Sequence, residues 1–210
     1  MSILFYLQAS PRIGRSHSIA VADAFVKAYK ENHPHDEIIT RNLFRMHLPA
    51  FDGLAVSAKY SILHGKHHSE EELKAWEDVE AVINEFKSAD KYVVAVPMWN
   101  FSIPYRLKQY IDLLVQPGYT FSYTAEEGYK GMITDKPILI VCARGGQYPP
   151  GGDAESIDFQ TKYLHFILGF MGFNDIRTVL VEPTLEEGPE VARKKRENAI
   201  VGAVEMACTF

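Results

Sequence analysis

The chain has 210 residues, with 22 Lys and Arg against 27 Asp and Glu, so its formal net charge is −5. An apolar content of 47% and a charged content of 23% are ordinary for a globular protein and argue against a disordered or fibrous chain. The mild acidity and the lack of a basic stripe argue against nucleic acid as a partner. We expect a single domain over residues 1–210, because a chain of this length can bury one sizeable core.

The longest apolar stretches, Tyr92–Pro97 and Ile167–Phe173, are far shorter than the roughly 20 residues that a membrane span needs. The first residues lack the basic region, the long apolar stretch and the cleavage site of a signal peptide. Cys142 and Cys208 are too few for a disulfide framework or a zinc site. We therefore expect a cytoplasmic protein without a membrane partner and without a bound metal.

Segments with strand and helix patterns alternate along the chain. Short apolar runs predict five strands, at Ile3–Ala9, Asp36–Phe44, Lys91–Pro97, Pro137–Ala143 and Ile176–Glu182. Apolar residues spaced three and four apart predict the helices between and after them, at Ile19–Tyr29, Leu73–Phe86, Leu107–Leu114, Ile157–Met171 and Pro189–Met206. This alternation is typical of an α/β protein whose parallel sheet has helices on both faces. Five strands favour a flavodoxin-like, doubly wound sheet with the order 2-1-3-4-5.

Polar residues at fixed spacings predict two helix starts. Ser69, followed by Glu72 three residues later, predicts a capping box before the second helix. Ser102 is expected to cap the third helix, with Pro104 in its first turn. The segment 45–69 shows no regular pattern, and we expect it to be irregular.

The segment Pro117–Met132 carries Tyr119, Phe121 and Tyr123 at alternate positions, which is typical of one face of a strand. A turn at 126–128 then predicts a hairpin. Two interpretations stay open for this hairpin: a flap beside a ligand, or a cover for the edge of the core.

Ligands of doubly wound sheets bind beyond the carboxyl ends of the strands, here at the loops after the first, third and fourth strands. The first of these loops is neither a Walker loop nor a GxGxxG motif, which argues against ATP and a standard dinucleotide site. The hydroxyls of Ser10, Ser16 and Ser18, with the free N–H groups of the following helix, suit a phosphate. The alternative is a plain turn in which Ser16 caps the helix.

The loop after the third strand is stiffened by a proline at each end and carries Trp99, Asn100 and Phe101, which suit a flat ligand. The alternative is that both rings pack on the core. The loop after the fourth strand contains Gly145 and Gly146, which permit positive φ and a close approach of the backbone to a ligand. A flexible turn is the alternative there.

These loops resemble those of the FMN-dependent NADH azoreductases, also called FMN-dependent NADH:quinone oxidoreductases. The matching residues are Ser10, the Ser16-His17-Ser18 turn, Met98-Trp99-Asn100-Phe101 and Arg144-Gly145-Gly146. The resemblance covers essentially the whole chain. It implies a homodimeric, flavodoxin-like enzyme that binds FMN without a covalent bond and uses NADH to reduce quinones and azo compounds.

The resemblance also implies a role for each matching position. The residues expected at the FMN phosphate are Ser10, Ser16, His17 and Ser18. Those expected to line the isoalloxazine ring are Pro97, Met98, Trp99, Asn100 and Phe101. Those expected at its pyrimidine edge are Ala143, Arg144, Gly145 and Gly146. Family members often carry Gln, Tyr and Ser where this chain has His17, Trp99 and Ala143.

In this interpretation the flavin performs the chemistry, and NADH and the acceptor use one place in turn, which predicts ping-pong kinetics. The N–H groups of Gly145 and Gly146, with Arg144 nearby, are expected to stabilise the charge of reduced flavin. No side chain is expected to be essential for the chemistry; Asn100, Phe121 and Phe170 are expected to support it.

The aromatic residues Phe159, Tyr163, Phe166 and Phe170 are spaced 4, 3 and 4 apart, which is typical of one helix face. The resemblance places this face at a dimer interface, with Phe170 near the partner's flavin. The alternative is one wide face that packs on the core.

Alternative functions are an electron carrier of the flavodoxin type, an NAD(P)H:FMN reductase that releases its flavin, and a non-catalytic binding module on the same fold. The modest net charge argues against the carrier. The cluster of His64, Lys66, His67 and His68 is interpreted as a solvated loop rather than a metal site.

Overall fold

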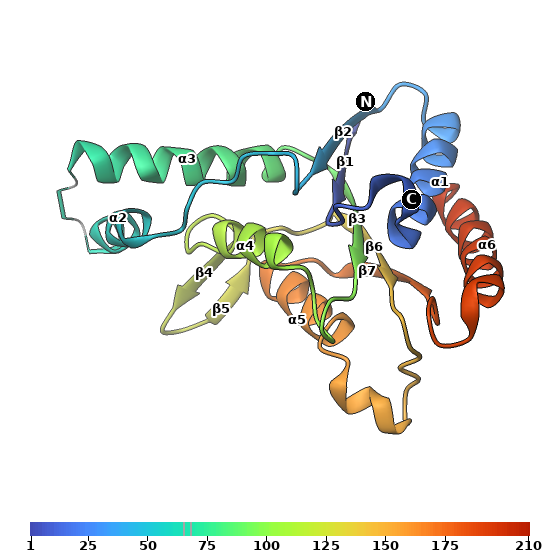
Figure 1. Cartoon of the computed structure of the whole chain (residues 1–210). Helices are drawn as coiled ribbons and strands as arrows, with labels where there is room; N and C mark the ends of the chain where they lie inside the picture. The colour runs from blue at the N-terminus through green and yellow to red at the C-terminus, as the bar shows by residue number, and fades with distance from the viewer. Residues whose placement is uncertain (65, 68) are drawn as a thin grey trace.

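Five parallel strands form the central sheet of the protein (Figure 1). The computed structural model describes residues 1–64, 66–67 and 69–210. From one edge to the other, the strands are β2 (Glu37–Asn42), β1 (Ile3–Gln8), β3 (Lys91–Pro97), β6 (Pro137–Ala143) and β7 (Asp175–Val181). In chain order this is 2-1-3-4-5, so the predicted doubly wound sheet is confirmed.

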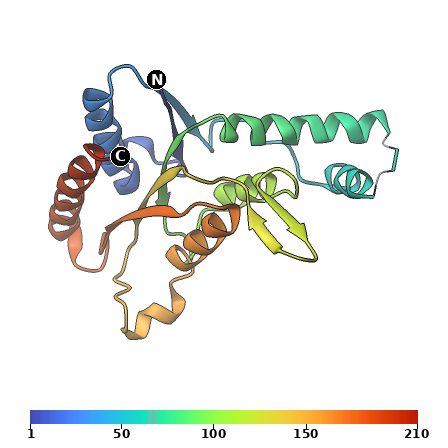
Figure 2. The same ribbon diagram turned by 180° about the vertical axis from the view of Figure 1, so that it is seen from behind.

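Helices cover both faces of the sheet (Figures 1 and 2). One face carries α1 (His17–Asn32) and α6 (Gly188–Ala207), which pack over a core that includes Phe25, Tyr29 and Phe210. The other face carries α3 (Glu70–Lys87), α4 (Tyr105–Leu114) and α5 (Thr161–Met171) over the larger core. None of the described helices combines the length and the apolarity that crossing a membrane requires.

The predicted capping box at the start of α3 is confirmed. The Ser69 hydroxyl accepts a hydrogen bond from the Glu72 amide at 3.1 Å, and the Glu72 carboxylate accepts one from the Ser69 amide at 2.9 Å. The apolar stripe that follows is buried from Trp76 to Phe86. The local start signal and the burial pattern therefore specify the same helix.

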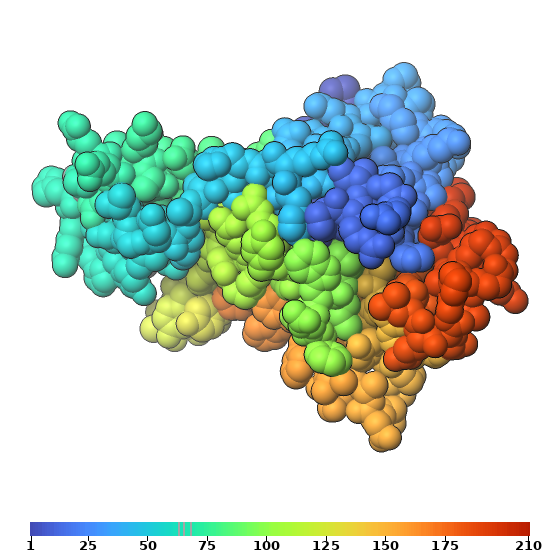
Figure 3. Space-filling model, in the orientation of Figure 1, coloured from blue at the N-terminus to red at the C-terminus, as the bar shows by residue number. Residues whose placement is uncertain are grey.

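The expectation that residues 45–69 are irregular is wrong, because α2 (Gly53–Leu63) lies within this segment. The Asp52 carboxylate caps it by accepting hydrogen bonds from the amides of Leu54 and Ala55. Among the described side chains of this helix, the fully buried ones are the small Ala55 and Ala58, and its sequence shows little apolar periodicity. Helix α2 packs on α3, and the two form an arm that stands off the sheet (Figures 1 and 3).

Two other helix starts differ from expectation. Helix α4 begins after Pro104, which is its N-cap, and Ser102 makes no capping bond. The backbone of Ser102 is instead occupied, since it exchanges two hydrogen bonds of 2.9 Å with Trp99. Helix α5 begins at Thr161, after the short 3-10 helix η2 (Asp153–Ile157), so Phe159 lies outside it.

The predicted hairpin is confirmed as strands β4 (Phe121–Thr124) and β5 (Gly128–Gly131). Tyr119 precedes β4 and does not share its face, because its hydroxyl contacts Trp76 and Glu80 of α3. The base of the hairpin lies against the end of α5, where Gly172 has a φ of 111°. A Cβ atom on Gly131 would lie 2.3 Å from the Gly172 nitrogen.

We expect Gly131→Ala to lower the free energy of unfolding by roughly 1–3 kcal/mol, because the backbones of the hairpin and α5 must separate. Urea denaturation measures this change. Gly202→Ala is the control, since its Cβ would meet nothing within 4 Å and alanine favours a helix interior. An unchanged stability of Gly131→Ala would show that this contact does not hold the hairpin.

Candidate functional site

The three loops singled out in the sequence lie together at one edge of the sheet. Strands β1, β3 and β6 are adjacent and parallel, so their carboxyl ends share that edge. Beyond the ends of the strands, the Ala9 amide donates to the Ala95 carbonyl at 2.9 Å, and the Met98 amide donates to the Ala143 carbonyl at 2.8 Å. The structure therefore brings the predicted site residues into one region.

The loop after β1 presents buried hydroxyls at the start of α1. Ser10, Ser16 and Ser18 are each less than 10% exposed. The hydroxyl oxygens of Ser16 and Ser18 lie 3.2 Å apart, and that of Ser16 also accepts a hydrogen bond from the Ile19 amide. Within the described part of the chain, the amides of His17 and Ser18 donate no hydrogen bond. Ser16 thus caps the helix while the helix end still offers donors to an anion.

His17, the first residue of α1, adds an unsatisfied nitrogen to this loop. Its Nδ1 atom is buried and has no hydrogen-bond partner among the described residues. Burial, followed by the nearby charges of Arg196 and Arg12, lowers the pKa of the imidazole below its usual value. His17 is therefore neutral at pH 7, with one buried nitrogen available to a ligand.

The loop after β3 is a tight turn with a left-handed backbone. Asn100 has a φ of 47° and Phe101 a φ of 68°, between the paired residues Trp99 and Ser102. Asparagine tolerates this region, whereas phenylalanine is rare there. The amides of Asn100 and Phe101 donate no hydrogen bond within the described residues, and the Phe101 ring is 49% exposed. Such strain persists only where the surroundings fix the backbone.

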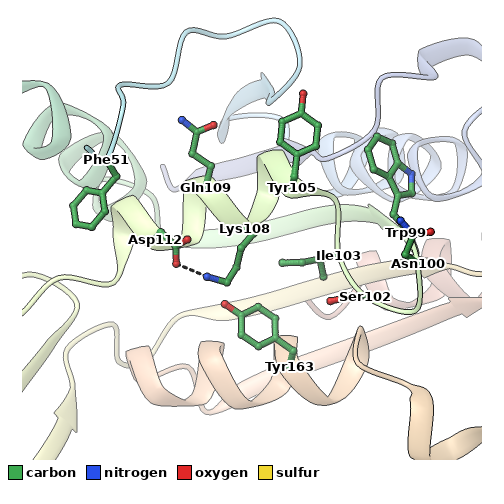
Figure 4. A pocket seen from close by; sticks show the side chains of 10 residues that line it. All are labelled: Phe51, Trp99, Asn100, Ser102, Ile103, Tyr105, Lys108, Gln109, Asp112 and Tyr163. Atoms are coloured by element: carbon green, nitrogen blue, oxygen red, sulfur yellow. Dashed lines mark hydrogen bonds and ion pairs between the residues drawn. The ribbon is translucent and has the colours of Figure 1, made fainter. Parts of the chain in front are cut away.

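A cavity of about 760 Å³ opens beside this turn (Figure 4). Trp99 and Asn100 line it on one side, Tyr105 of α4 and Tyr163 of α5 on others. The Trp99 ring lies 6.4 Å from that of Tyr105 and 5.7 Å from that of Phe44. The cavity is thus lined by aromatic rings together with polar side chains, among them Lys108 and Asp112.

The loop after β6 contains two glycines whose role differs from expectation. Neither Gly145 nor Gly146 has a positive φ. A Cβ on Gly145 would lie 2.9 Å from Leu185 Cδ1, and one on Gly146 would lie 2.3 Å from Glu186 Oε1. The glycines therefore allow the segment after β7 to pack closely. Their amides donate no hydrogen bond to the described residues, so both remain available to a ligand.

Arg144, which is expected near the charge of a ligand, is buried and paired within the protein. The side chain is 2% exposed, and its Nη1 atom donates to Asp158 Oδ2 at 2.7 Å. Its Nε atom lies 3.3 Å from Glu182 Oε2, an ion-pair contact outside hydrogen-bond geometry. Two carboxylates therefore take up the charge of this guanidinium.

Three consecutive residues, Asp158–Gln160, join the loops, and we call them the clip. Asp158 binds Arg144, the Phe159 amide donates to the Phe101 carbonyl at 3.0 Å, and the Gln160 side chain donates to the Val96 carbonyl at 3.1 Å. Asp158 also accepts hydrogen bonds from the Gln160 and Thr161 amides at the start of α5. The clip therefore fixes the end of β3 and both following loops relative to one another.

Burial opposes ionisation of Asp158, but hydrogen bonds from Thr161 and the charge of Arg144 outweigh it. The pKa of the Asp158 carboxyl is therefore lowered, and it is charged at neutral pH.

Sequence reasoning missed three residues of this site: Asp158, Gln160 and Glu182. Asp158 and Gln160 lie within the predicted helix Ile157–Met171, so the turn that they form before α5 was not expected. Glu182 directly follows the last strand. A search for the partner of an arginine at the end of a buried strand could have found it, because a buried guanidinium requires a counter-charge.

The hairpin and α5 meet in an aromatic cluster. The Phe170 ring lies 4.9 Å from that of Phe121 and 5.6 Å from that of Tyr129. Phe166, by contrast, is 69% exposed and Phe159 is 57% exposed. The four aromatic residues predicted for one helix face are thus divided. Phe170 packs on the hairpin, Tyr163 packs against the core, and Phe159 and Phe166 are exposed.

The described residues of the histidine-rich segment, His64, Lys66 and His67, lie between α2 and α3, which form the arm. The His64 ring is 2.7 Å from the Tyr60 carbonyl through Nδ1, His67 is exposed, and His68 lies outside the described residues. Over the described ranges, no group of three or more His, Cys, Asp or Glu side chains could hold a metal ion.

Known proteins resemble this chain over its full length. The family model described as "Flavodoxin-like fold" matches residues 1–205. A protein of Nitratidesulfovibrio vulgaris strain DP4 named FMN-dependent NADH:quinone oxidoreductase is 52% identical over 210 residues, which cover 100% of both chains.

Solved structures agree with this result. An azoreductase from Bacillus anthracis strain Sterne superposes with a TM-score of 0.91 at 33% identity and covers 100% of both chains. An FMN-dependent NADH-azoreductase from the Ames Ancestor strain, in complex with FMN, superposes with a TM-score of 0.87 at 29% identity, with 99% of this chain and 100% of that chain covered. The chain belongs to this flavodoxin-like family.

We expect Arg144→Met to lower the free energy of unfolding by about 3–5 kcal/mol, because it leaves Asp158 and Glu182 without their counter-charge. Arg193→Met is the matched control: Arg193 also pairs with two carboxylates, but on the exposed surface of α6, so its loss should barely change stability. Equal effects of the two substitutions in urea denaturation would contradict the importance of the buried cluster.

The same cluster predicts a dependence on pH. Because folding lowers the pKa of Asp158, its contribution is present above the unfolded value near 4 and is lost as the pH falls through the folded value. The stability difference between wild type and Asp158→Asn should therefore be large at pH 7 and shrink below about pH 4. A difference that is constant from pH 7 to pH 3 would contradict this.

Proposed function

We propose that this member of the flavodoxin-like family is an FMN-dependent oxidoreductase that uses NADH for two-electron reduction of quinones and azo compounds. The observation that carries the proposal is the set of unsatisfied donors at the three loops, namely the amides of His17, Ser18, Asn100, Phe101, Gly145 and Gly146. The printed names of the relatives, FMN-dependent NADH:quinone oxidoreductase and FMN-dependent NADH-azoreductase, support the same assignment.

The loop after β1 fits the phosphate of FMN. A phosphate dianion needs several donors in a region of positive potential, and the start of a helix of 16 residues supplies both. The hydroxyls of Ser10, Ser16 and Ser18 lie around this helix end, and the free nitrogen of His17 adds a further polar contact. We assign these four residues to the phosphate.

The other two loops fit a flat, hydrogen-bonding ring. The amides of Gly145 and Gly146 suit the carbonyl oxygens of a pyrimidine edge and stabilise negative charge that develops there. Ala143 adds no side-chain donor, so contacts at this position come from the backbone. The turn from Pro97 to Phe101 would supply two further amides, and its Trp99 and Asn100 side chains line the cavity beside it.

When bound, FMN supplies the two-electron chemistry between NADH and the acceptor. The role of the chain is to bind, orient and exclude water, and we assign no essential acid or base to it. Asn100 supports ligand orientation. Phe121 and Phe170 lie near the end of α5, away from the three loops at its start, and would offer apolar surface to the flavin of a partner subunit. Because donor and acceptor would use one place in turn, we expect ping-pong kinetics, with NADH preferred as the donor.

We further propose that the protein is a homodimer. Apolar rings of the α4 and α5 region are exposed, among them Tyr105 at 65%, Phe159 at 57% and Phe166 at 69%. Aromatic side chains are enriched at protein–protein interfaces. We also propose a cytoplasmic location, since Cys142 and Cys208 are both free.

The direct test is anaerobic titration of the purified protein. We expect a yellow protein that retains FMN on gel filtration, loses its flavin absorption on addition of NADH, and regains it with benzoquinone or methyl red. Initial rates should give parallel double-reciprocal lines. A colourless protein that does not bind FMN contradicts the proposal. Flavin that bleaches only with another reduced protein would favour an electron carrier, and loss of FMN on the column would favour a flavin reductase.

Light scattering tests the homodimer. We expect a mass of twice 23.8 kDa at micromolar concentration. Phe166→Glu should shift the protein toward the monomer, because it places a charge within the proposed apolar interface. Glu77→Gln on the arm serves as the surface control. A wild-type monomer would refute this part of the proposal.

A further inference from the structure

The buried cluster of Arg144, Asp158 and Glu182 carries an excess of negative charge. Their side chains are 2%, 6% and 17% exposed, respectively. Arg144 is the sole described cation that forms an ion pair with either carboxylate. One positive and two negative charges leave the cluster with a net charge of −1, screened little by solvent.

Neighbouring charges do not offset this excess. The side chains of the cluster line a cavity of about 460 Å³, and Lys162 lines it too. The ammonium nitrogen of Lys162, however, lies 3.9 Å from the Glu155 carboxylate and pairs with it. Glu186 places a further carboxylate beside Gly146. The surroundings therefore keep the region negative.

The cluster is next to the amides that we assign to the flavin. Arg144 directly precedes Gly145 and Gly146, and Glu182 directly follows β7, the strand paired with β6. The Arg144 carbonyl accepts hydrogen bonds from the amide and the hydroxyl of Thr184 at 2.9 and 2.8 Å, which fixes the two segments together. The position of the charge relative to the amides is thus set by the fold.

We propose that Asp158 and Glu182 set the redox preference of the site: their excess negative charge makes it bind reduced FMN less tightly, relative to oxidised FMN, than a neutral cluster would. This inference rests on the proposed function. NADH delivers two electrons and one proton as hydride, so the bound flavin gains one negative charge. Like charges nearby disfavour that state, which favours onward transfer of the electron pair to the acceptor.

The side chain of Glu182 allows a test with little change of shape. Glu182→Gln removes one charge, and its amide oxygen can still accept the hydrogen bond that the Tyr148 amide donates to Glu182. We expect the affinity for reduced FMN to rise about tenfold relative to that for oxidised FMN, which raises the midpoint potential by about 30 mV for a two-electron couple. Anaerobic titration against a reference dye measures the potential.

Glu187→Gln is the matched control, because it removes the same charge from an exposed residue whose carboxylate contacts Gln147. Its midpoint potential should equal that of wild type. Asp158→Asn is the second variant and should shift the potential in the same direction as Glu182→Gln; it also serves if the latter does not fold.

A purely structural role for the cluster would lower stability and leave the potential unchanged. Potentials of Glu182→Gln and Asp158→Asn that equal the wild-type value, or lie below it, overturn the inference while the proposed function stands. A wild-type protein that binds no FMN overturns the proposed function and the inference with it.

Discussion

Burial of the Arg144 guanidinium is the constraint on which the arrangement of the site depends. A buried charge is costly unless it is paired and hydrogen-bonded, so Arg144 requires carboxylates from other parts of the chain. Asp158 comes from the segment before α5 and Glu182 from the end of β7. Each pairing fixes a loop at the carboxyl edge of the sheet. The clip connects the ion pair of Asp158 to the strained turn, because the amide of Phe159 donates a hydrogen bond to the Phe101 carbonyl.

This rigidity explains how loops can present precise hydrogen-bonding groups. Loops carry function most often where a rigid scaffold positions them. Here six amides of the loops after β1, β3 and β6 lack partners within the described protein, while the carbonyls of Val96, Phe101 and Gly145 are bound. The carbonyl groups of these loops are therefore bound within the protein, while the six amides remain free to donate to a ligand. An arrangement of this kind suits a ligand with a flat apolar surface and hydrogen-bond acceptors that the free amides can reach.

Much of the fold could be predicted from the sequence because its signals are local. Strands β1, β3 and β6 are buried and read as nearly continuous apolar runs, and the shorter apolar runs of β2 and β7 also mark their places. Helix α2 was missed because the described side chains that it buries fully are small alanines, which give no periodic apolar signal. The start of α5 was misplaced because Asp158 interrupts the helix for a reason that lies elsewhere in the chain, at Arg144.

In the candidate site, too, local features could be predicted from the sequence, and contacts between distant residues could not. The hydroxyls near α1 and the turn at Asn100 follow from local chemistry and from the resemblance to a family. The pairing of Arg144 could not follow from them, because its partners are 14 and 38 positions away in the printed sequence. The glycines after Arg144 illustrate the point, since they have no positive φ and instead lie close to the side chains of Leu185 and Glu186.

We propose that the unsatisfied backbone amides of the three loops hold FMN, and the other assignments depend on this. Amide resonances recorded by NMR before and after addition of FMN test it most directly. We expect shifts and slowed hydrogen exchange that concentrate at His17, Ser18, Asn100, Phe101, Gly145 and Gly146. Saturating FMN that leaves these amides unchanged, or that protects a different edge of the sheet, would contradict it.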